Sequence, residues 1–366
     1  MSDFDIIKST DIGIANPTGR MIDGKKECLL NANLIKPIIL YSPSTLGNSI
    51  KYNGKNLISH INASLSTNSN PKVWYESGST GNPFGSSSIF SNCYGNGKYV
   101  AVGIDGKMAY STDGITWTAV ADSTFGSSYI ESICYGSGKY VAGGYKGKMA
   151  YSTDGVTWTA VANSTFGNSN GIYSICYETG KFVAGGGSGK MAYSTDGVTW
   201  TKVDNSTFES YDIKSICYGN GKFVAGGGNN SGKMAYSTDG ITWTAVADST
   251  FRGSYIESIC YGNGKFVAGG YKGKMAYSTD GVTWTAVANS IFNYDDIYST
   301  CYGNGKFVAG GRGGKMAYST DGITWTKVDN STFGSSYIES ICYGNGKFVA
   351  GGYDGKMAYC QVGIPE

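Results

Sequence analysis

Residues 138–159 read GKYVAGGYKGKMAYSTDGVTWT, and near-copies of this stretch recur down most of the chain. A Cys-Tyr pair precedes each copy, with its cysteine at Cys93, Cys134, Cys176, Cys217, Cys260, Cys301 and Cys342. Successive cysteines are 41 to 43 residues apart. A fixed period of this size indicates a repeat architecture, in which each repeat is one small unit that packs on its neighbours.

Each repeat is expected to contain four short strands. In the second repeat the pattern predicts them at Ile130–Tyr135, Lys139–Gly143, Lys148–Ser152 and Thr157–Val161. Gly, Asp and Ser occupy the breaks, where tight hairpins need positive φ angles and local hydrogen bonds. No segment has helical periodicity, and the 56 glycines of the chain disfavour helices. Four antiparallel strands in about 41 residues are typical of a β-propeller blade.

The two ends of the repeat region predict how the ring closes. Seven Cys-Tyr strands are present, but the last repeat stops after Met357-Ala358-Tyr359 and lacks a fourth strand. The missing strand is expected around Trp74, ahead of the first Cys-Tyr pair. Pairing of these two segments would leave no blade with an open edge. We therefore predict an all-β fold whose main domain is a seven-bladed β-propeller over residues 72–360.

The third hairpin of each full repeat, for example Ser111-Thr112-Asp113-Gly114-Ile115-Thr116-Trp117, resembles the Asp-box motif of sialidase-like propellers. It is one residue shorter between Asp and Gly. The resemblance covers six hairpins and implies a propeller fold in which the box is a folding element remote from any active site. The residues that it assigns to structure are Asp113, Asp154, Asp196, Asp239, Asp280 and Asp321, with Trp117, Trp158, Trp200, Trp243, Trp284 and Trp325; Trp74 joins the tryptophans by position. The Asp carboxylates are expected to accept backbone N–H bonds, and the tryptophans to fill space between blades.

Composition narrows the possible partners. The chain has 29 basic and 27 acidic residues, and the predicted propeller carries 22 of each. This balance argues against binding to nucleic acid or to an anionic membrane surface. No apolar run is long enough to insert into a membrane, and Met1–Asp11 does not read as a secretory signal. We expect synthesis in the cytoplasm without a signal peptide, with action outside the cell after release or as part of a virion or tail particle.

The nine cysteines are predicted to be free. Seven of them lie at equivalent positions of successive repeats, which should be too far apart for a disulfide. They are expected to pack as small apolar side chains.

The regions outside the propeller are small. Residues 1–66 are predicted to form a β-rich module for attachment to a larger particle or for oligomerisation, with a trimer favoured, although packing against the propeller is the alternative. Residues 67–71 are a polar linker, and residues 361–366 a short tail. His60, the only histidine, is expected to be a structural or surface residue.

Comparison of the repeats with one another predicts the binding surface. Two loops vary: the one between the second and third strands, and the one joining a blade to the next, as in Gly126–Glu131. In a blade of four antiparallel strands both loops leave from the same end, so one face of the disc is variable and the other uniform. The candidate ligand-binding residues on the variable face are Tyr129, Tyr145, Lys146, Tyr255, Tyr271, Lys272, Tyr294, Arg312, Tyr337, Tyr353 and Asp354. Such side chains stack on, or hydrogen-bond to, sugars and protein surfaces.

Catalysis is not expected. The propeller has no histidine, so Ser-His-Asp and Cys-His arrangements are excluded. Its two arginines, Arg252 and Arg312, are too few for the three-arginine clamp of sialidases. No Cys/His cluster has the spacing of metal ligands, and we predict no metal and no cofactor. Asp295-Asp296 could form a carboxylate pair for glycoside cleavage, but a solvated acidic loop is the expected reading.

The sequence thus predicts a non-enzymatic recognition protein that binds a surface glycan or another cell-surface polymer through several similar sites. Its layout is similar to that of receptor-binding tail proteins of bacteriophages and phage-tail-like bacteriocins. The alternative is a protein-binding scaffold or assembly factor, and a glycoside hydrolase is a more distant possibility.

Overall fold

The computed structural model describes residues 70–77 and 82–362 and six two-residue strands before them. The chain divides into two compact units, Met1–Thr67 and Asn68–Glu366. In the first unit the described strands form three ladders: β1 (Ile14–Ala15) with β4 (Leu29–Leu30), β2 (Met21–Ile22) with β3 (Lys25–Lys26), and β5 (Lys51–Tyr52) with β6 (Lys55–Asn56). Cys28, His60 and residues 363–366 lie outside the described residues.

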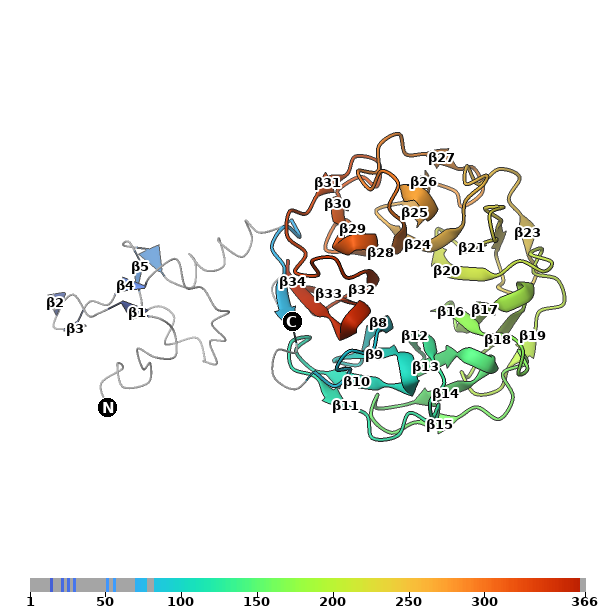
Figure 1. Ribbon diagram of the computed structural model, residues 1–366, viewed down its shortest axis with the longest axis horizontal. Coiled ribbons are helices and arrows are strands. Elements are labelled where there is room, and N and C mark those ends of the chain that lie inside the picture. The colour runs from blue at the N-terminus through green and yellow to red at the C-terminus, as the bar shows by residue number, and fades with distance from the viewer. Residues whose placement is uncertain are drawn as a thin grey trace. The chain divides into compact units, whose positions relative to one another are not determined.

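The second unit is a ring of seven four-stranded antiparallel sheets (Figure 1). The innermost strands are β8 (Ile89–Gly95), β12 (Ile130–Gly136), β16 (Ile172–Glu178), β20 (Ile213–Gly219), β24 (Ile256–Gly262), β28 (Ile297–Gly303) and β32 (Ile338–Gly344). The second strands are β9 (Lys98–Gly103), β13 (Lys139–Gly144), β17 (Lys181–Gly186), β21 (Lys222–Gly227), β25 (Lys265–Gly270), β29 (Lys306–Gly311) and β33 (Lys347–Gly352). The third are β10 (Met108–Ser111), β14 (Met149–Ser152), β18 (Met191–Ser194), β22 (Met234–Ser237), β26 (Met275–Ser278), β30 (Met316–Ser319) and β34 (Met357–Gln361). The outer strands are β11 (Thr118–Ala119), β15 (Thr159–Ala160), β19 (Thr201–Lys202), β23 (Thr244–Ala245), β27 (Thr285–Ala286), β31 (Thr326–Lys327) and β7 (Tyr75–Ser77).

The predicted seven-bladed propeller is confirmed, including its closure. Strand β7, from before the first full repeat, pairs antiparallel with β34, so that Met357 lies opposite Ser77 and Tyr359 opposite Tyr75. The Tyr75 and Tyr359 rings stack with centroids 5.5 Å apart. In Figure 1 the blue β7 lies beside the red β34. The last blade is therefore completed by a strand from the other end of the domain, which stabilises the ring against opening.

The first three strands of the second blade agree with the sequence prediction to within one residue, and the fourth does not. That strand covers Thr159–Ala160 rather than Thr157–Val161. The backbone N–H groups of Val156 and Thr157 both donate to Asp154 Oδ1 at 2.8 Å, which places these residues in the turn and not in the ladder. These bonds lower the pKa of Asp154 to about 2. The predicted capture of backbone N–H groups by the Asp carboxylate is thus observed, and it recurs in all six hairpins.

The core lies between blades. In one cluster Val141 and Met149 of the second blade pack against Ile172, Phe182 and Trp200 of the third, and every other pair of neighbours repeats this arrangement. The seven tryptophans are only 4–7% exposed, so the prediction that they fill the space between blades is confirmed. Each blade is therefore stabilised by its neighbours, as expected for a repeat too small to bury its own core.

Among the described residues, no helix has the length and apolar character needed to cross a membrane.

Candidate functional site

The two variable loops lie at the same end of each blade. The Tyr145 N–H, in the loop between second and third strands, donates to the Tyr129 carbonyl, in the loop between blades, at 2.9 Å. Tyr271 and Tyr353 make equivalent bonds of 3.1 and 3.0 Å to the carbonyls of Tyr255 and Tyr337. We call this end the variable face, and the opposite end, formed by the Asp hairpins, the uniform face. The prediction that diversity is confined to one face is confirmed.

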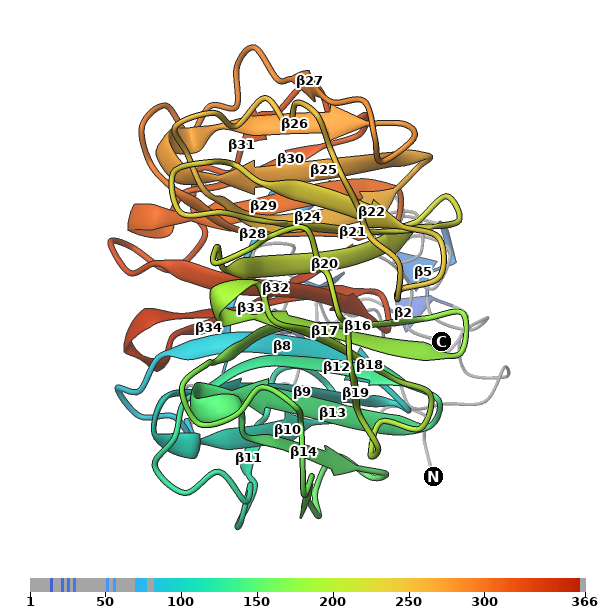
Figure 2. The same cartoon turned by 90° about the vertical axis from the view of Figure 1, so that its right-hand side faces the viewer.

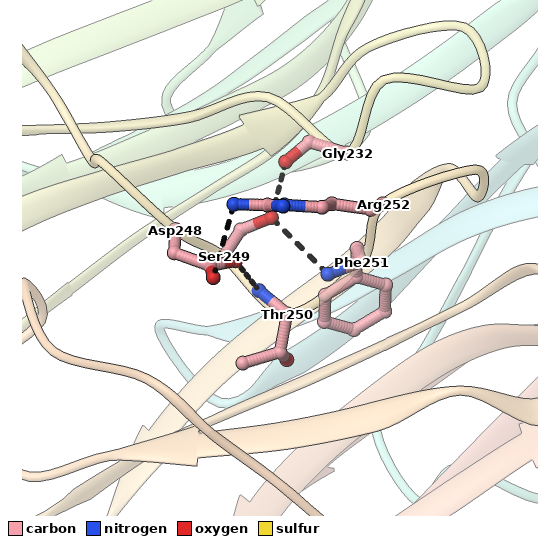
Figure 3. A network of polar contacts seen from close by, with 6 residues as sticks. All are labelled: Gly232, Asp248, Ser249, Thr250, Phe251 and Arg252. Atoms are coloured by element: carbon pink, nitrogen blue, oxygen red, sulfur yellow. Dashed lines mark hydrogen bonds and ion pairs between the residues drawn. The ribbon is translucent and has the colours of Figure 1, made fainter.

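A repeated frame holds the loops of the variable face in place (Figure 3). In the loop between the fourth and fifth blades, Ser249 Oγ donates to the carbonyl of Gly232 and accepts the N–H of Phe251 at 3.3 Å. Phe251 is fully buried, and Asp248 Oδ1 accepts the N–H of Thr250 at 2.9 Å. In the seventh loop Asn82 Nδ2 donates to the Gly355 carbonyl at 2.7 Å. Serines make the same kind of bond to a glycine carbonyl in the five others: Ser123, Ser164, Ser206, Ser290 and Ser331. The variable residues therefore project from a fixed support, which favours a preformed binding surface.

Short 3₁₀ turns carry the variable side chains between the second and third strands: η1 (Ile104–Gly106), η2 (Tyr145–Gly147), η3 (Gly187–Gly189), η4 (Tyr271–Gly273), η5 (Arg312–Gly314) and η6 (Tyr353–Gly355). Lys146 at the centre of η2 has φ = 58°, a left-handed conformation that few non-glycine residues adopt. Gly147 follows at φ = 65°, and a Cβ there would lie 2.6 Å from the Gly167 carbonyl oxygen. The glycine is thus required by the close approach of the neighbouring loop.

The structure brings the predicted tyrosines together in pairs. Tyr129 and Tyr145 have ring centroids 6.1 Å apart. Tyr129 is 43% exposed and Tyr145 is 52% exposed. The corresponding distances are 5.1 Å for Tyr255 with Tyr271, and 4.8 Å for Tyr337 with Tyr353. These pairs belong to the second, fifth and seventh blades. The variable face therefore presents three similar aromatic platforms.

The other candidate residues have varied surroundings. The Arg312 guanidinium lies 5.8 Å from the Tyr337 ring centroid, in cation–π contact. Lys146 and Lys272 each lie over the ring of the tyrosine before them, at 5.5 and 5.3 Å. Asp354 accepts a 2.8 Å bond from Ser336 Oγ. Tyr294 is 85% exposed and contributes to none of the three pairs.

The fold gathers one further set of residues around the propeller axis. The sequence alone did not identify this set as a candidate site. In each blade the innermost strand contains a β-bulge, so that one residue has no partner in the ladder; in β12 the register shifts between Ile130 and Ser132 and leaves out Glu131. Bulges re-aim side chains and are common beside functional sites. The seven bulge residues, which we call the bulge ring, are Phe90, Glu131, Tyr173, Lys214, Glu257, Tyr298 and Glu339. One feature of the sequence could have identified this position. The residue varies between repeats, whereas the Ile before it and the Ser after it do not.

The bulge ring lies on the innermost strands, which surround the propeller axis (Figure 1). Burial is the main cause that raises the pKa of Glu339 to about 8, and the charges of Glu257 and Glu131 raise it further. These two glutamates lie two blades away on either side, so each of them interacts with Glu339 across the ring. Burial also raises the pKa values of Glu257 and Glu131, and the Lys214 ammonium opposes both shifts. Lys214 itself lies 4.0 Å from the Tyr173 ring centroid and 3.7 Å from Asp212 Oδ2.

The carboxylates of Asp295 and Asp296 contact different groups. Asp295 is ion-paired with Lys315 at 2.5 Å. Asp296 is buried, and its Oδ1 accepts the N–H of Lys272 at 2.8 Å. Both carboxylates therefore serve to hold loops. Over the described part of the chain, no group of three His, Cys, Asp or Glu side chains is arranged to hold a metal ion.

Comparison with known proteins identifies the fold and no family. No family model and no curated protein matches the sequence. Among solved structures, YCF48 bound to a D1 peptide is similar with a TM-score of 0.64 and 14% identity, covering 81% of this chain and 96% of that one. The WD40 propeller domain of Doa1 has a TM-score of 0.57 at 14% identity, over 78% and 97% of the two chains. A catalytically inactive virginiamycin B lyase from Staphylococcus aureus, with quinupristin, has a TM-score of 0.64 at 12% identity, over 79% and 99%. At these identities the likeness concerns the propeller fold alone.

Proposed function

We propose that this protein is a non-enzymatic binding propeller, a scaffold or assembly factor, that holds an extended segment of a partner protein across its variable face. The observation that carries the proposal is the grouping of three tyrosine pairs with the bulge ring on one face. The pairs range from exposed (Tyr129 with Tyr145) to half-buried (Tyr255 with Tyr271). Tyrosines offer large contact area at low entropic cost, which suits protein recognition. On the uniform face the Asp hairpins repeat nearly unchanged from blade to blade.

The comparisons support a protein partner more than a glycan. One similar structure is described as YCF48 with a bound D1 peptide, and another is a WD40 propeller domain. Neither likeness transfers a partner to this chain at 14% identity. The first of these structures, a propeller described with a bound peptide, supports the proposal of a peptide ligand.

Selection of random 12-residue displayed peptides on the full chain tests the proposal. The selected peptides should bind a Tyr145→Ala, Tyr271→Ala, Tyr353→Ala variant at least about tenfold more weakly, since each lost aromatic anchor costs about 1 kcal/mol or more. A matched control truncates two exposed apolar residues of the uniform face, Ile241→Ala with Ile323→Ala. Failure to select any peptide, or equal loss in both variants, would refute the proposal.

Carbohydrate binding is the second candidate, because exposed tyrosines also stack on sugar rings. A glycan array probed with the full chain and with the same tyrosine variant separates the two. Glycan binding that depends on the tyrosines, together with no peptide selection, would favour the receptor-binding interpretation made from the sequence.

We further propose that residues 1–66 attach the propeller to a larger particle or to other copies, with a trimer favoured. Light scattering of the full chain after size-exclusion chromatography tests self-association. A monomer at every concentration would rule out the homo-oligomer.

A further inference from the structure

Three blades carry the same combination of residues on the variable face. Tyr-Ile-Glu occurs at residues 129–131, 255–257 and 337–339. In each case the tyrosine belongs to one of the three pairs described above and the glutamate to the bulge ring. The aromatic platforms therefore surround a set of three axial carboxylates.

We propose, building on the peptide-binding function above, that the partner segment carries a lysine or arginine side chain that enters the bulge ring. The positive group would lie among Glu131, Glu257 and Glu339, while the rest of the segment contacts the tyrosine pairs. The occupant is thus a basic peptide segment, and neither an acidic nor a neutral one.

Charge complementarity supports this choice. Within the described residues, the carboxyl groups of Glu131, Glu257 and Glu339 accept no side-chain or backbone hydrogen bond. None of them lies within 4 Å of a Lys or Arg nitrogen of this part of the chain. The one cation of the bulge ring, Lys214, is held by Asp212 and by the Tyr173 ring. The ring therefore carries three carboxyl groups against one ammonium. Burial and the charges of Glu257 and Glu131 raise the pKa of Glu339 to about 8, and an incoming cation would favour the ionised form of all three groups.

The surrounding aromatic rings favour the same occupant. Tyr353 and Tyr298 lie close enough to Glu339 to interact with its charge, as does Tyr173 with Glu131. A cation over a tyrosine face gains cation–π attraction in addition to the pairing with carboxylate. An acidic side chain would be repelled by both groups.

A metal ion is a poorer occupant. The three glutamates project from blades two or three positions apart around the ring, and they do not form a cluster with the spacing of metal ligands. A long, flexible ammonium or guanidinium group can instead bridge several carboxylates at larger separations.

The test uses the best peptide selected on the full chain and a second peptide in which its basic residue is made neutral: citrulline for arginine, acetyl-lysine for lysine. Binding of both is measured by fluorescence anisotropy to the wild type, to Glu131→Gln/Glu257→Gln/Glu339→Gln, and to Glu76→Gln/Glu178→Gln. The last variant removes two negative charges at exposed glutamates outside the bulge ring and outside both variable loops. Circular dichroism confirms that each variant is folded.

We expect a lysine or arginine at one fixed position of the selected peptides. Its neutralisation should weaken binding to the wild type and to the control by about tenfold or more, and should have much less effect on the bulge-ring variant. Selected peptides without a basic residue, or an equal effect of neutralisation in all three proteins, would overturn this inference. Peptide binding that still depends on Tyr145, Tyr271 and Tyr353 would then leave the proposed function standing.

Discussion

The hydroxyl oxygen of Ser132 accepts a 2.9 Å hydrogen bond from the backbone N–H of Ile175 in the next blade. Each inner strand is an edge strand of its own sheet, and edge strands leave backbone groups unpaired. The same serine-to-backbone bond joins every other pair of neighbouring blades, from Ser91, Ser174, Ser215, Ser258, Ser299 and Ser340. Seven such bonds form a closed circle around the axis.

The first prediction concerns this circle. Ser132→Ala should destabilise the protein by about 1–3 kcal/mol, because it leaves the buried N–H of Ile175 without an acceptor. Urea unfolding followed by tryptophan fluorescence measures the change. Ser127→Ala, on an exposed loop position, should change stability by less than about 0.5 kcal/mol. Equal free energies of unfolding for the two variants would show that this hydrogen bond does not contribute to stability.

A second prediction concerns the tryptophans between blades. Trp117 Nε1 donates to Ser77 Oγ at 3.0 Å, whereas Trp158 Nε1 is buried and unpaired among the described residues. Val120 occupies the position equivalent to Ser77 and packs in the cluster of Trp158. Val120→Ser should therefore supply the missing acceptor, and Val120→Ala removes the same apolar groups without supplying one. We expect the serine variant to be the more stable by about 1 kcal/mol in thermal or urea unfolding; the reverse order would contradict the geometry.

The third prediction is a pH dependence of stability that arises at the bulge ring. The pKa of Glu339 is about 8 in the folded protein against an ordinary value of 4.5, raised by burial and by Glu257 and Glu131. Tyr298 and Tyr353 also face this carboxylate. The folded state therefore binds more protons than the unfolded state between these two pH values, and the contribution of Glu339 falls as pH rises through this window.

The Glu339→Gln variant has no titrating carboxyl group at this position, so it does not lose this contribution to stability as the pH rises. The free energy of unfolding of the variant relative to the wild type should therefore increase from about pH 5 to about pH 8.5. Glu76→Gln, at an exposed position of β7, serves as the control. A constant difference across the pH range would show that Glu339 titrates normally.

The fourth prediction concerns the thiols. All eight cysteines in the described part of the chain are free. Burial raises their pKa values, that of Cys176 to about 12. Since the thiolate is the reactive form, a Cys28→Ser variant should react slowly with Ellman's reagent when native. All eight thiols should react after unfolding, and fast reaction of the native protein would contradict the raised pKa values of these buried and half-buried thiols.

Most of the architecture follows from the sequence because the information is local. The turn residues set the hairpins, the period of 41 to 43 residues sets the size of a blade, and the seven Cys-Tyr strands set the number of blades. The surplus strand at Trp74, matched to the incomplete last repeat, predicts the closure. In a sheet of four antiparallel strands, the loop after the second strand and the loop after the fourth leave from the same end. The sequence alone therefore locates Tyr129 and Tyr145 on one face.

Only the tertiary structure decided which side chains meet at the axis. Glu131, Glu257 and Glu339 are far apart in the chain, and ring closure brings them together. The alternation of side chains along a strand does not predict which way these glutamates point. Each is the extra residue of a β-bulge, where the two-residue period of the strand is interrupted. The electrostatic character of the variable face is therefore a property of the closed ring, which no single repeat contains.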